Sequence, residues 1–101
     1  MHINAVTEFI DNVINAVRNA IREGDYPTWD DFCVDMTLPA DILAGHKLTV
    51  WGEVNDEGER YFSVYVKTCD EDIRFSLICD NTSMEALGNT LAEAMERAAA
   101  S

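Results

Sequence analysis

The side chains that most often do chemistry in proteins are histidine, cysteine and serine, and this sequence gives none of them a recognisable site. His46 lies beside Lys47, with no Cys or His at the spacing of a metal ligand. Cys33, Cys69 and Cys79 are odd in number and far apart, which is typical of free thiols rather than of zinc ligands. No serine falls in a nucleophile-elbow pattern. The sequence therefore predicts no catalytic residue, no metal ligand and no cofactor.

Glycines and carboxylates are the other candidates for chemistry, and neither forms a motif. The five glycines are scattered and make no phosphate-binding loop. The acidic turns "NDEGE" and "CDED" do not fit the calcium-binding loop of an EF-hand. Two carboxylates can act together as general acid and base, but among 19 acidic residues such a pair arises easily by chance. We therefore expect a protein that binds rather than an enzyme.

The most informative stretch is "RYFSVYVKT", which alternates as a strand with two different faces. Its apolar side chains fall on one face and its tyrosines on the other. The first face holds Phe62, Val64 and Val66, and the second holds Tyr61, Ser63, Tyr65 and Lys67. A very acidic chain thus keeps two tyrosines away from its core.

Two amphipathic helices and four strands must position these residues. Apolar residues recur at three- and four-residue steps in the first and last segments, 6–21 and 84–98, which predicts a helix at each end. Period-two alternation predicts strands in four segments: 32–38, 48–54, 60–68 and 73–80. The connections are too short for parallel crossovers. The prediction is an α+β fold and a single domain, 1–101, in which a four-stranded antiparallel meander sheet carries the N- and C-terminal helices on one face (α-β-β-β-β-α).

Turn and cap residues set the expected limits of these elements. Gly24 and Pro27 should end the first helix before a loop at 25–31. The segment "PADILAG" fits one helical turn from Pro39 to Gly45. Thr82-Ser83-Met84-Glu85 fits a capping box before the last helix. Gly88 lies on the apolar stripe of that helix, where it indicates close approach to the sheet or to the first helix.

Loop lengths predict the strand register. A five-residue loop, 55–59, pairs Thr49 with Tyr65, Trp51 with Ser63, and Glu53 with Tyr61. A four-residue turn, 68–71, pairs Val66 with Ile73 on the inner face. On the outer face the same turn sets Lys67 opposite Asp72, Tyr65 opposite Arg74, and Tyr61 opposite Ile78. Trp51, Tyr61, Tyr65 and Ile78 should then cluster beside Arg74 and Lys67, on the sheet face that no helix covers.

The aromatic side chains on this uncovered face have two interpretations. Aromatic residues favour strands and stabilise cross-strand pairs without any partner. Trp51 is harder to explain in that way, because a tryptophan can bury about 150–250 Å². Aromatics beside arginine are also frequent anchors of protein interfaces. The face is therefore a candidate partner site or homodimer interface.

The charge of the chain limits what it can bind. Nineteen acidic and seven basic residues give a formal charge of −12. This charge repels nucleic acid and anionic membranes and steers the chain toward basic surfaces. It exceeds the roughly 2–8 charges that solubility requires of a small domain, although solubility alone remains an alternative. No segment is long and apolar enough to cross a membrane, and no secretion signal precedes the first helix, so we expect a cytoplasmic protein.

The acids fall mainly in loops and on outer strand faces, where they could replace the phosphates of a nucleic acid. In size, acidity and helix–sheet mix the chain resembles the small anti-CRISPR and anti-restriction proteins of phages and other mobile elements. That resemblance implies stoichiometric inhibition of a host nuclease complex, without a cofactor. An immunity or antitoxin-type protein, and a small homodimeric ligand-binding domain or enzyme that uses the open face, are alternatives. The candidate partner-binding residues are Trp51, Tyr61, Tyr65, Arg74, Ile78, Asp56, Glu57, Glu59, Asp70, Glu71 and Asp72.

Overall fold

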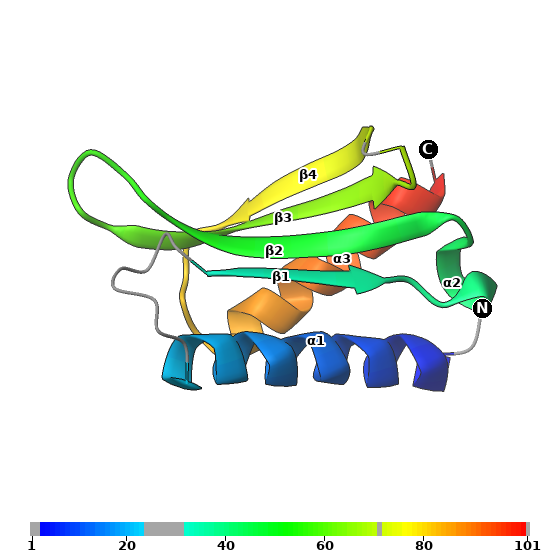
Figure 1. Cartoon of the computed structure of the whole chain (residues 1–101), viewed down its shortest axis with the longest axis horizontal. Coiled ribbons are helices and arrows are strands. Elements are labelled where there is room, and N and C mark those ends of the chain that lie inside the picture. The colour runs from blue at the N-terminus through cyan, green and yellow to red at the C-terminus, as the bar shows by residue number, and fades with distance from the viewer. Residues whose placement is uncertain (1–2, 24–31, 71, 101) are drawn as a thin grey trace.

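The fold is helix, four-stranded sheet, helix, as the sequence predicts. A computed structural model describes residues 3–23, 32–70 and 72–100. In chain order the elements are α1 (Ile3–Glu23), β1 (Cys33–Thr37), α2 (Ala40–Leu43), β2 (His46–Val54), β3 (Arg60–Thr68), β4 (Ile73–Cys79) and α3 (Met84–Ala100). The strands lie in the order β1-β2-β3-β4, and each neighbouring pair is antiparallel (Figure 1). The α+β meander is confirmed.

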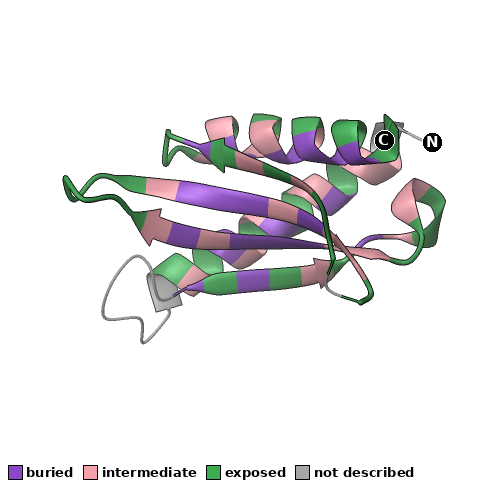
Figure 2. Ribbon diagram, turned by 90° about the horizontal axis from the view of Figure 1, so that it is seen from above, coloured by how far each residue is buried: buried purple, intermediate pink, exposed green. Residues whose placement is uncertain are grey.

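Both long helices cover the same face of the sheet. α3 packs against β3 and β4, while α1 packs against β1 and against α3. Buried residues alternate with more exposed ones along β1, because successive side chains point to opposite faces. β2 and β3 each bury three residues in a row, since Thr49 and Ser63 on the outer face are also buried (Figure 2). Phe62, Val64 and Val66 are fully buried, as expected. The prediction of an inner apolar face on β3 is therefore confirmed.

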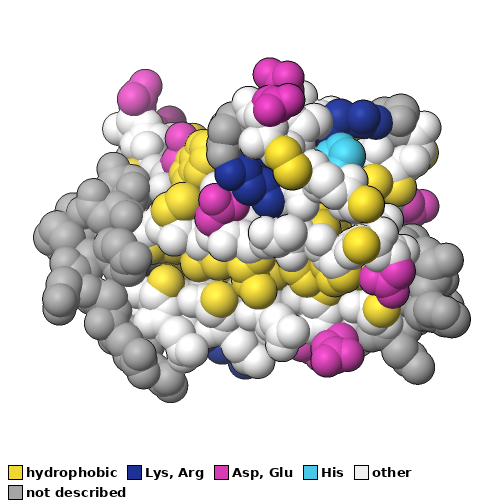
Figure 3. All heavy atoms as spheres, turned by 45° about the vertical axis from the view of Figure 1, so that its right-hand side comes forward, with side chains coloured by type: hydrophobic (Ala, Val, Ile, Leu, Met, Phe, Trp, Pro, Cys, Tyr) yellow, Lys and Arg dark blue, Asp and Glu magenta, His cyan; other side chains and the backbone are white. Residues whose placement is uncertain are grey.

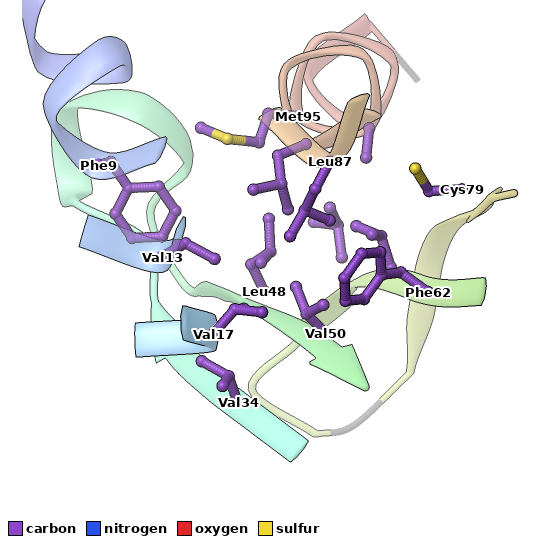
Figure 4. Packing of buried hydrophobic residues seen from close by; sticks show 14 of the residues in the cluster. Phe9, Val13, Val17, Val34, Leu48, Val50, Phe62, Cys79, Leu87 and Met95 are labelled. Carbon is purple, nitrogen blue, oxygen red and sulfur yellow. The ribbon is translucent and has the colours of Figure 1, made fainter. Parts of the chain in front are cut away.

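The core lies between this inner face and the two helices (Figure 4). Val13 and Val17 come from α1 and Leu87 from α3, and all three are completely buried. They meet side chains of β2 and β3 such as Leu48 and Phe62. Each such side chain contributes roughly 1.5–3 kcal/mol relative to leaving it exposed. The apolar stripes of the helices and the inner face of the sheet thus hold the fold together.

The two helices come close together at Gly88. A Cβ atom at this position would lie 3.2 Å from Cδ1 of Ile14 and 3.9 Å from Cγ2 of Ile10, both on α1. A methyl group would therefore crowd the facing helix, which explains a glycine inside a helix despite its poor propensity. Of the two explanations predicted for Gly88, the approach is to the first helix and not to the sheet.

The predicted register is right for one hairpin and wrong for the other. β2 and β3 pair as expected, with Thr49 opposite Tyr65 and Trp51 opposite Ser63. β3 and β4 are shifted by two residues, so that Val66 lies opposite Phe75.

Two features cause this shift, a tighter turn and a β-bulge near the start of β4, and each moves the register by one residue. The backbone N–H of Thr68 donates to the carbonyl oxygen of Asp72 at 2.9 Å, which closes the turn early. The register then slips between Val66 and Lys67, and Arg74 is the extra residue. A two-residue shift leaves most of β4 on its predicted face, because the side-chain period is two. Ile73, which precedes the bulge, is the exception and is 55% exposed instead of lying in the core.

Most of the predicted turn residues are confirmed, with one correction. Gly45 and Gly58 have positive φ angles of 77° and 81°, and Pro39 precedes the short helix α2. The cap of α3 is Ser83, whose Oγ accepts a hydrogen bond from the N–H of Ala86 at 3.2 Å. The predicted capping box from Thr82 to Glu85 is therefore wrong. The Oδ1 of Asn81 accepts the N–H of Ser83 at 2.8 Å and delays the start of the helix. The predictions for Gly24, Pro27 and the loop 25–31 lie outside the described residues.

Candidate functional site

Trp51 and Tyr65 form the centre of the open sheet face. Their rings meet edge to face, with centroids 4.4 Å apart and planes at 80°. The Nζ of Lys67 lies 5.5 Å from the Trp51 ring centroid and 5.6 Å from that of Tyr65. Cation–π attraction and the ring contact therefore hold the three side chains together. The predicted opposition of Tyr65 and Arg74 is wrong, because the bulge places Ser76 opposite Tyr65.

Two polar side chains lie opposite this aromatic pair in the sheet and are buried: Thr49 opposite Tyr65, and Ser63 opposite Trp51. Thr49 is 4% exposed, and its Oγ1 donates a hydrogen bond of 2.9 Å to Oδ1 of Asp35. The Nζ of Lys47 lies 3.9 Å from the other oxygen of that carboxylate. Ser63 is 2% exposed and donates to Oε2 of Glu53. The buried hydroxyl groups of the open face are thus hydrogen-bonded to carboxylates of the same face. Trp51 is half-buried among these side chains.

Two ionisable groups on this face are held in their neutral forms. Partial burial raises the pKa of Tyr61, and the charge of Glu53 and a hydrogen bond to it raise that pKa further. Partial burial and the charge of Asp35 raise the pKa of Cys33, against an opposing effect of Lys67. A thiol with a raised pKa is a poor nucleophile. Neither group is therefore activated for catalysis.

The most exposed apolar side chains of the face lie on β4. Ile78 is 63% exposed and sits opposite Ser63, while Ile73 is 55% exposed and sits opposite Lys67. The predicted opposition of Ile78 and Tyr61 is wrong, because the register differs by two residues. The expected cluster is therefore divided. Trp51, Tyr65 and Lys67 meet at the centre of the sheet, whereas Ile78 and Arg74 belong to its edge strand.

The hairpin between β2 and β3 holds three exposed acids on an ordered backbone. Asn55 Oδ1 accepts the N–H groups of both Glu57 and Glu59 at 2.9 Å, and Asn55 Nδ2 donates to Oε1 of Glu59 at 3.2 Å. Backbone bonds between Asn55 and Glu59 and between Gly58 and Asn55, each 3.0 Å, close the loop. We call residues 55–59 the acidic hairpin, after Asp56, Glu57 and Glu59.

Sequence reasoning missed the role of Asn55. The signal was present, because an asparagine that begins a turn often bonds to backbone groups two residues further on. Its three side-chain bonds make the acidic hairpin a preformed feature and not a loose loop.

A second acidic turn lies at the other end of the sheet. Asp70 and Asp72 are exposed, and Glu71 lies outside the described residues. The N–H of Asp72 donates to Oγ1 of Thr68 at 3.2 Å, and the N–H of Cys69 donates to the carbonyl oxygen of Gly45 at 3.1 Å. Figure 1 shows this turn and the acidic hairpin at opposite ends of a molecule whose longest extent is 37 Å. The two acidic turns therefore form separate surfaces.

The surface between these ends is mixed. On the face shown in Figure 3, carboxylates occur singly or in small groups at separate points, and a band of hydrophobic side chains crosses the view. A shallow hollow of about 360 Å³ beside the acidic hairpin is lined by Asn55, Glu59, Arg60, Tyr61 and Asp80. Within the described ranges, no three His, Cys, Asp or Glu side chains lie close enough to hold a metal ion. In the same part of the chain, no helix is long and apolar enough to span a membrane.

The fold and its surfaces define an acidic α+β protein with a four-stranded meander, an open sheet face that carries Trp51 and Tyr65, and two acidic turns. No family model, curated protein or solved structure matches the chain. The functional argument therefore depends on its own residues.

Proposed function

We propose that this protein is a non-enzymatic inhibitor that occupies a basic surface of a partner protein, chiefly one that would otherwise bind nucleic acid. The observation that carries the proposal is the acidic hairpin, in which Asn55 fixes the backbone beneath three exposed carboxylates. A loop that is already ordered loses less conformational entropy when it binds, so more of its electrostatic attraction remains as affinity.

The proposed mechanism is competition. Asp56, Glu57 and Glu59 would meet lysine and arginine side chains that normally contact phosphates, and Asp80 adds a carboxylate beside the same hollow. The formal charge of −12 would steer the encounter with a basic surface. No covalent step and no cofactor is required. The resemblance to anti-CRISPR and anti-restriction proteins makes a host nuclease complex the first partner to test.

The test compares two baits of equal charge in affinity capture from host lysate. The hairpin variant is D56N/E57Q/E59Q, and the control variant is E8Q/D11N/E96Q, whose acids lie exposed on α1 and α3. Each variant changes the formal charge from −12 to −9. The unmodified protein and the control should capture the same partner, and the hairpin variant should recover much less of it. The captured partner should then lose bound DNA or RNA when the protein is added.

Two results would contradict the proposal. One is a partner that the hairpin variant retains as well as the control does. The other is a partner that binds no nucleic acid and whose activity is unchanged in the complex. Capture of a toxin whose active site is basic would instead favour the immunity-type alternative. The electrostatic argument is the same for both functions, so the identity of the partner separates them.

A further inference from the structure

The two edges of the sheet are protected to different degrees. β1 has only five residues and carries the exposed Asp35 at its middle, and α1 runs directly below it in Figure 1. β4 has seven residues, and Figure 1 shows its outer edge without a neighbouring element. Short length and charged side chains are the usual protections of an edge strand. β1 has both of them, whereas β4 is longer and has one charged residue, Arg74, and a bulge at its first residues.

β4 holds the most exposed apolar side chains of the sheet and, like β3, no acidic residue. Its sequence, "IRFSLIC", contains one charged residue, Arg74, in a chain whose formal charge is −12. Ile73 and Ile78 are the two most exposed large apolar side chains among the described residues, at 55% and 63%. Phe75 and Leu77 on the inner face are only partly buried. This edge therefore combines open backbone groups, exposed apolar area and no acid within the strand.

We propose that β4 pairs antiparallel with β4 of a second copy, across a two-fold axis at Leu77, so that the two sheets become one. This pairing sets Phe75 opposite Cys79 of the other copy and Ser76 opposite Ile78 of the other copy. It also sets Arg74 opposite Asp80, the residue that directly follows β4. Because the axis repeats each contact, two Arg–Asp pairs form at once.

Charge selects this register from the alternatives. In an antiparallel pair the numbers of any two opposed residues add up to the same sum. If that sum were odd, inner-face residues would lie opposite outer-face residues. An axis at Ser76 also keeps the faces matched and pairs all seven residues of β4, but it sets Arg74 opposite Ile78 and forms no ion pair. The axis at Leu77 pairs the five residues from Phe75 to Cys79 and adds the attraction between Arg74 and Asp80.

The molecule that pairs with β4 is a second copy of the chain, because the charges of this segment are complementary to themselves across a two-fold axis. The same short segment supplies the cation at one end and the anion at the other, as a two-fold interface requires. This interface shares Asp80 with the hollow beside the acidic hairpin but uses none of Asp56, Glu57 and Glu59, so it holds whether or not the proposed function is correct.

The test is a charge swap read by sedimentation equilibrium at about 0.15 M salt. The unmodified protein should approach twice its monomer mass as its concentration rises toward about 1 mM. R74E should weaken the dimer about tenfold by placing two acids opposite each other, and D80R should weaken it similarly by pairing two arginines. The double variant R74E/D80R restores opposite charges, and its dimerisation should return to within about threefold of the original.

If dimerisation depended on net charge alone, the four variants would show a different pattern of dimer strengths, which makes the test decisive. R74E and the control R18E each add two negative charges, while D80R and the control D11R each remove two. If only net charge mattered, R18E would weaken the dimer as much as R74E does, and D80R would strengthen it. Either outcome would overturn the proposal, as would a monomeric protein at about 1 mM or a double variant as weak as the single ones. Circular dichroism spectra should be unchanged in all variants, because these positions are exposed.

Discussion

Glu53 accepts hydrogen bonds from two hydroxyl groups on the open face, those of Ser63 and Tyr61. Ser63 is almost fully buried, so its hydroxyl needs this partner. Tyr61 is half-buried and keeps its proton because partial burial and the nearby carboxylate both oppose a second negative charge. The carboxylate therefore orders one tyrosine of the face without activating it.

We predict that E53Q lowers the pKa of Tyr61 toward its ordinary value of 10.0. Glutamine keeps the shape and one accepting oxygen, but it removes the charge that disfavours tyrosinate. The ring Cζ resonance of Tyr61, followed by NMR through alkaline pH, measures the change. S63A is the control, since it removes a neighbouring hydroxyl and leaves the charge in place. An unchanged pKa in E53Q would show that burial alone sets it.

The same shift gives a pH dependence of stability. The folded protein holds the Tyr61 proton more tightly than the unfolded chain does, because the pKa is raised above 10.0. This contribution is fully present below pH 10.0 and is lost as the pH rises through the folded pKa. The free energy of unfolding should therefore fall less steeply above pH 10.0 in Y61F than in the unmodified protein, as measured by urea denaturation.

At the scale of single residues, the sequence predicts which face a side chain occupies better than which neighbour it contacts. Trp51 and Tyr65 lie on the open face as expected. The cation over their rings is Lys67 and not Arg74. The alternation of a strand sets the face, but the neighbour depends on register, and one extra residue at a bulge changes every contact beyond it.

At the scale of elements, α1 and α3 come close together at Gly88. An alanine at position 88 would improve helix propensity by about 1 kcal/mol. Its Cβ would also lie 3.2 Å from Cδ1 of Ile14, which would have to move. Ile14 is half-buried and the contacting atom is the end of its side chain, so a small movement is feasible.

We predict that G88A raises the free energy of unfolding by less than about 0.5 kcal/mol, because crowding offsets the gain in propensity. In an I14V background the Cδ1 atom is absent, and the same substitution should gain about 1 kcal/mol. Urea denaturation of the four proteins in this double-mutant cycle gives the coupling energy. Equal gains in both backgrounds would show that the contact with Ile14 is not what disfavours a side chain at position 88.

The elements themselves were predictable because their signals are local and repeated. The stripes of α1 and α3 and the alternation of the four strands each extend over many residues, so single exceptions do not matter. The cap of α3 and the start of β4 depend on one or two hydrogen bonds instead. Asn81 moved the cap to Ser83, and the bond between Thr68 and Asp72 shortened a turn. Such bonds compete with equally plausible alternatives in the sequence.

At the scale of the whole molecule, the length of the protein is comparable to the range of electrostatic forces at low salt. The longest extent is 37 Å, and the acidic hairpin and the second acidic turn lie at opposite ends. The Debye length is about 30 Å at 0.01 M salt and about 8 Å at 0.15 M salt. At low salt a basic partner therefore experiences nearly the whole charge of −12, whereas at 0.15 M salt it experiences mainly the acids that face it.

This difference separates a local binding role of the acidic hairpin from a general effect of charge. We predict that D56N/E57Q/E59Q and E8Q/D11N/E96Q slow association with the captured partner to similar degrees at 0.01 M salt, since each removes three of the 19 acids. At 0.15 M salt only the hairpin variant should remain slower than the unmodified protein, because the acids of α1 and α3 are then screened from the contact. Association rates measured at both salt concentrations test this. Equal slowing by both variants at 0.15 M would mean that net charge, and not the ordered hairpin, guides the encounter. No slowing by either variant at either concentration would assign the charge to solubility and leave the Trp51–Tyr65 face as the surface that binds.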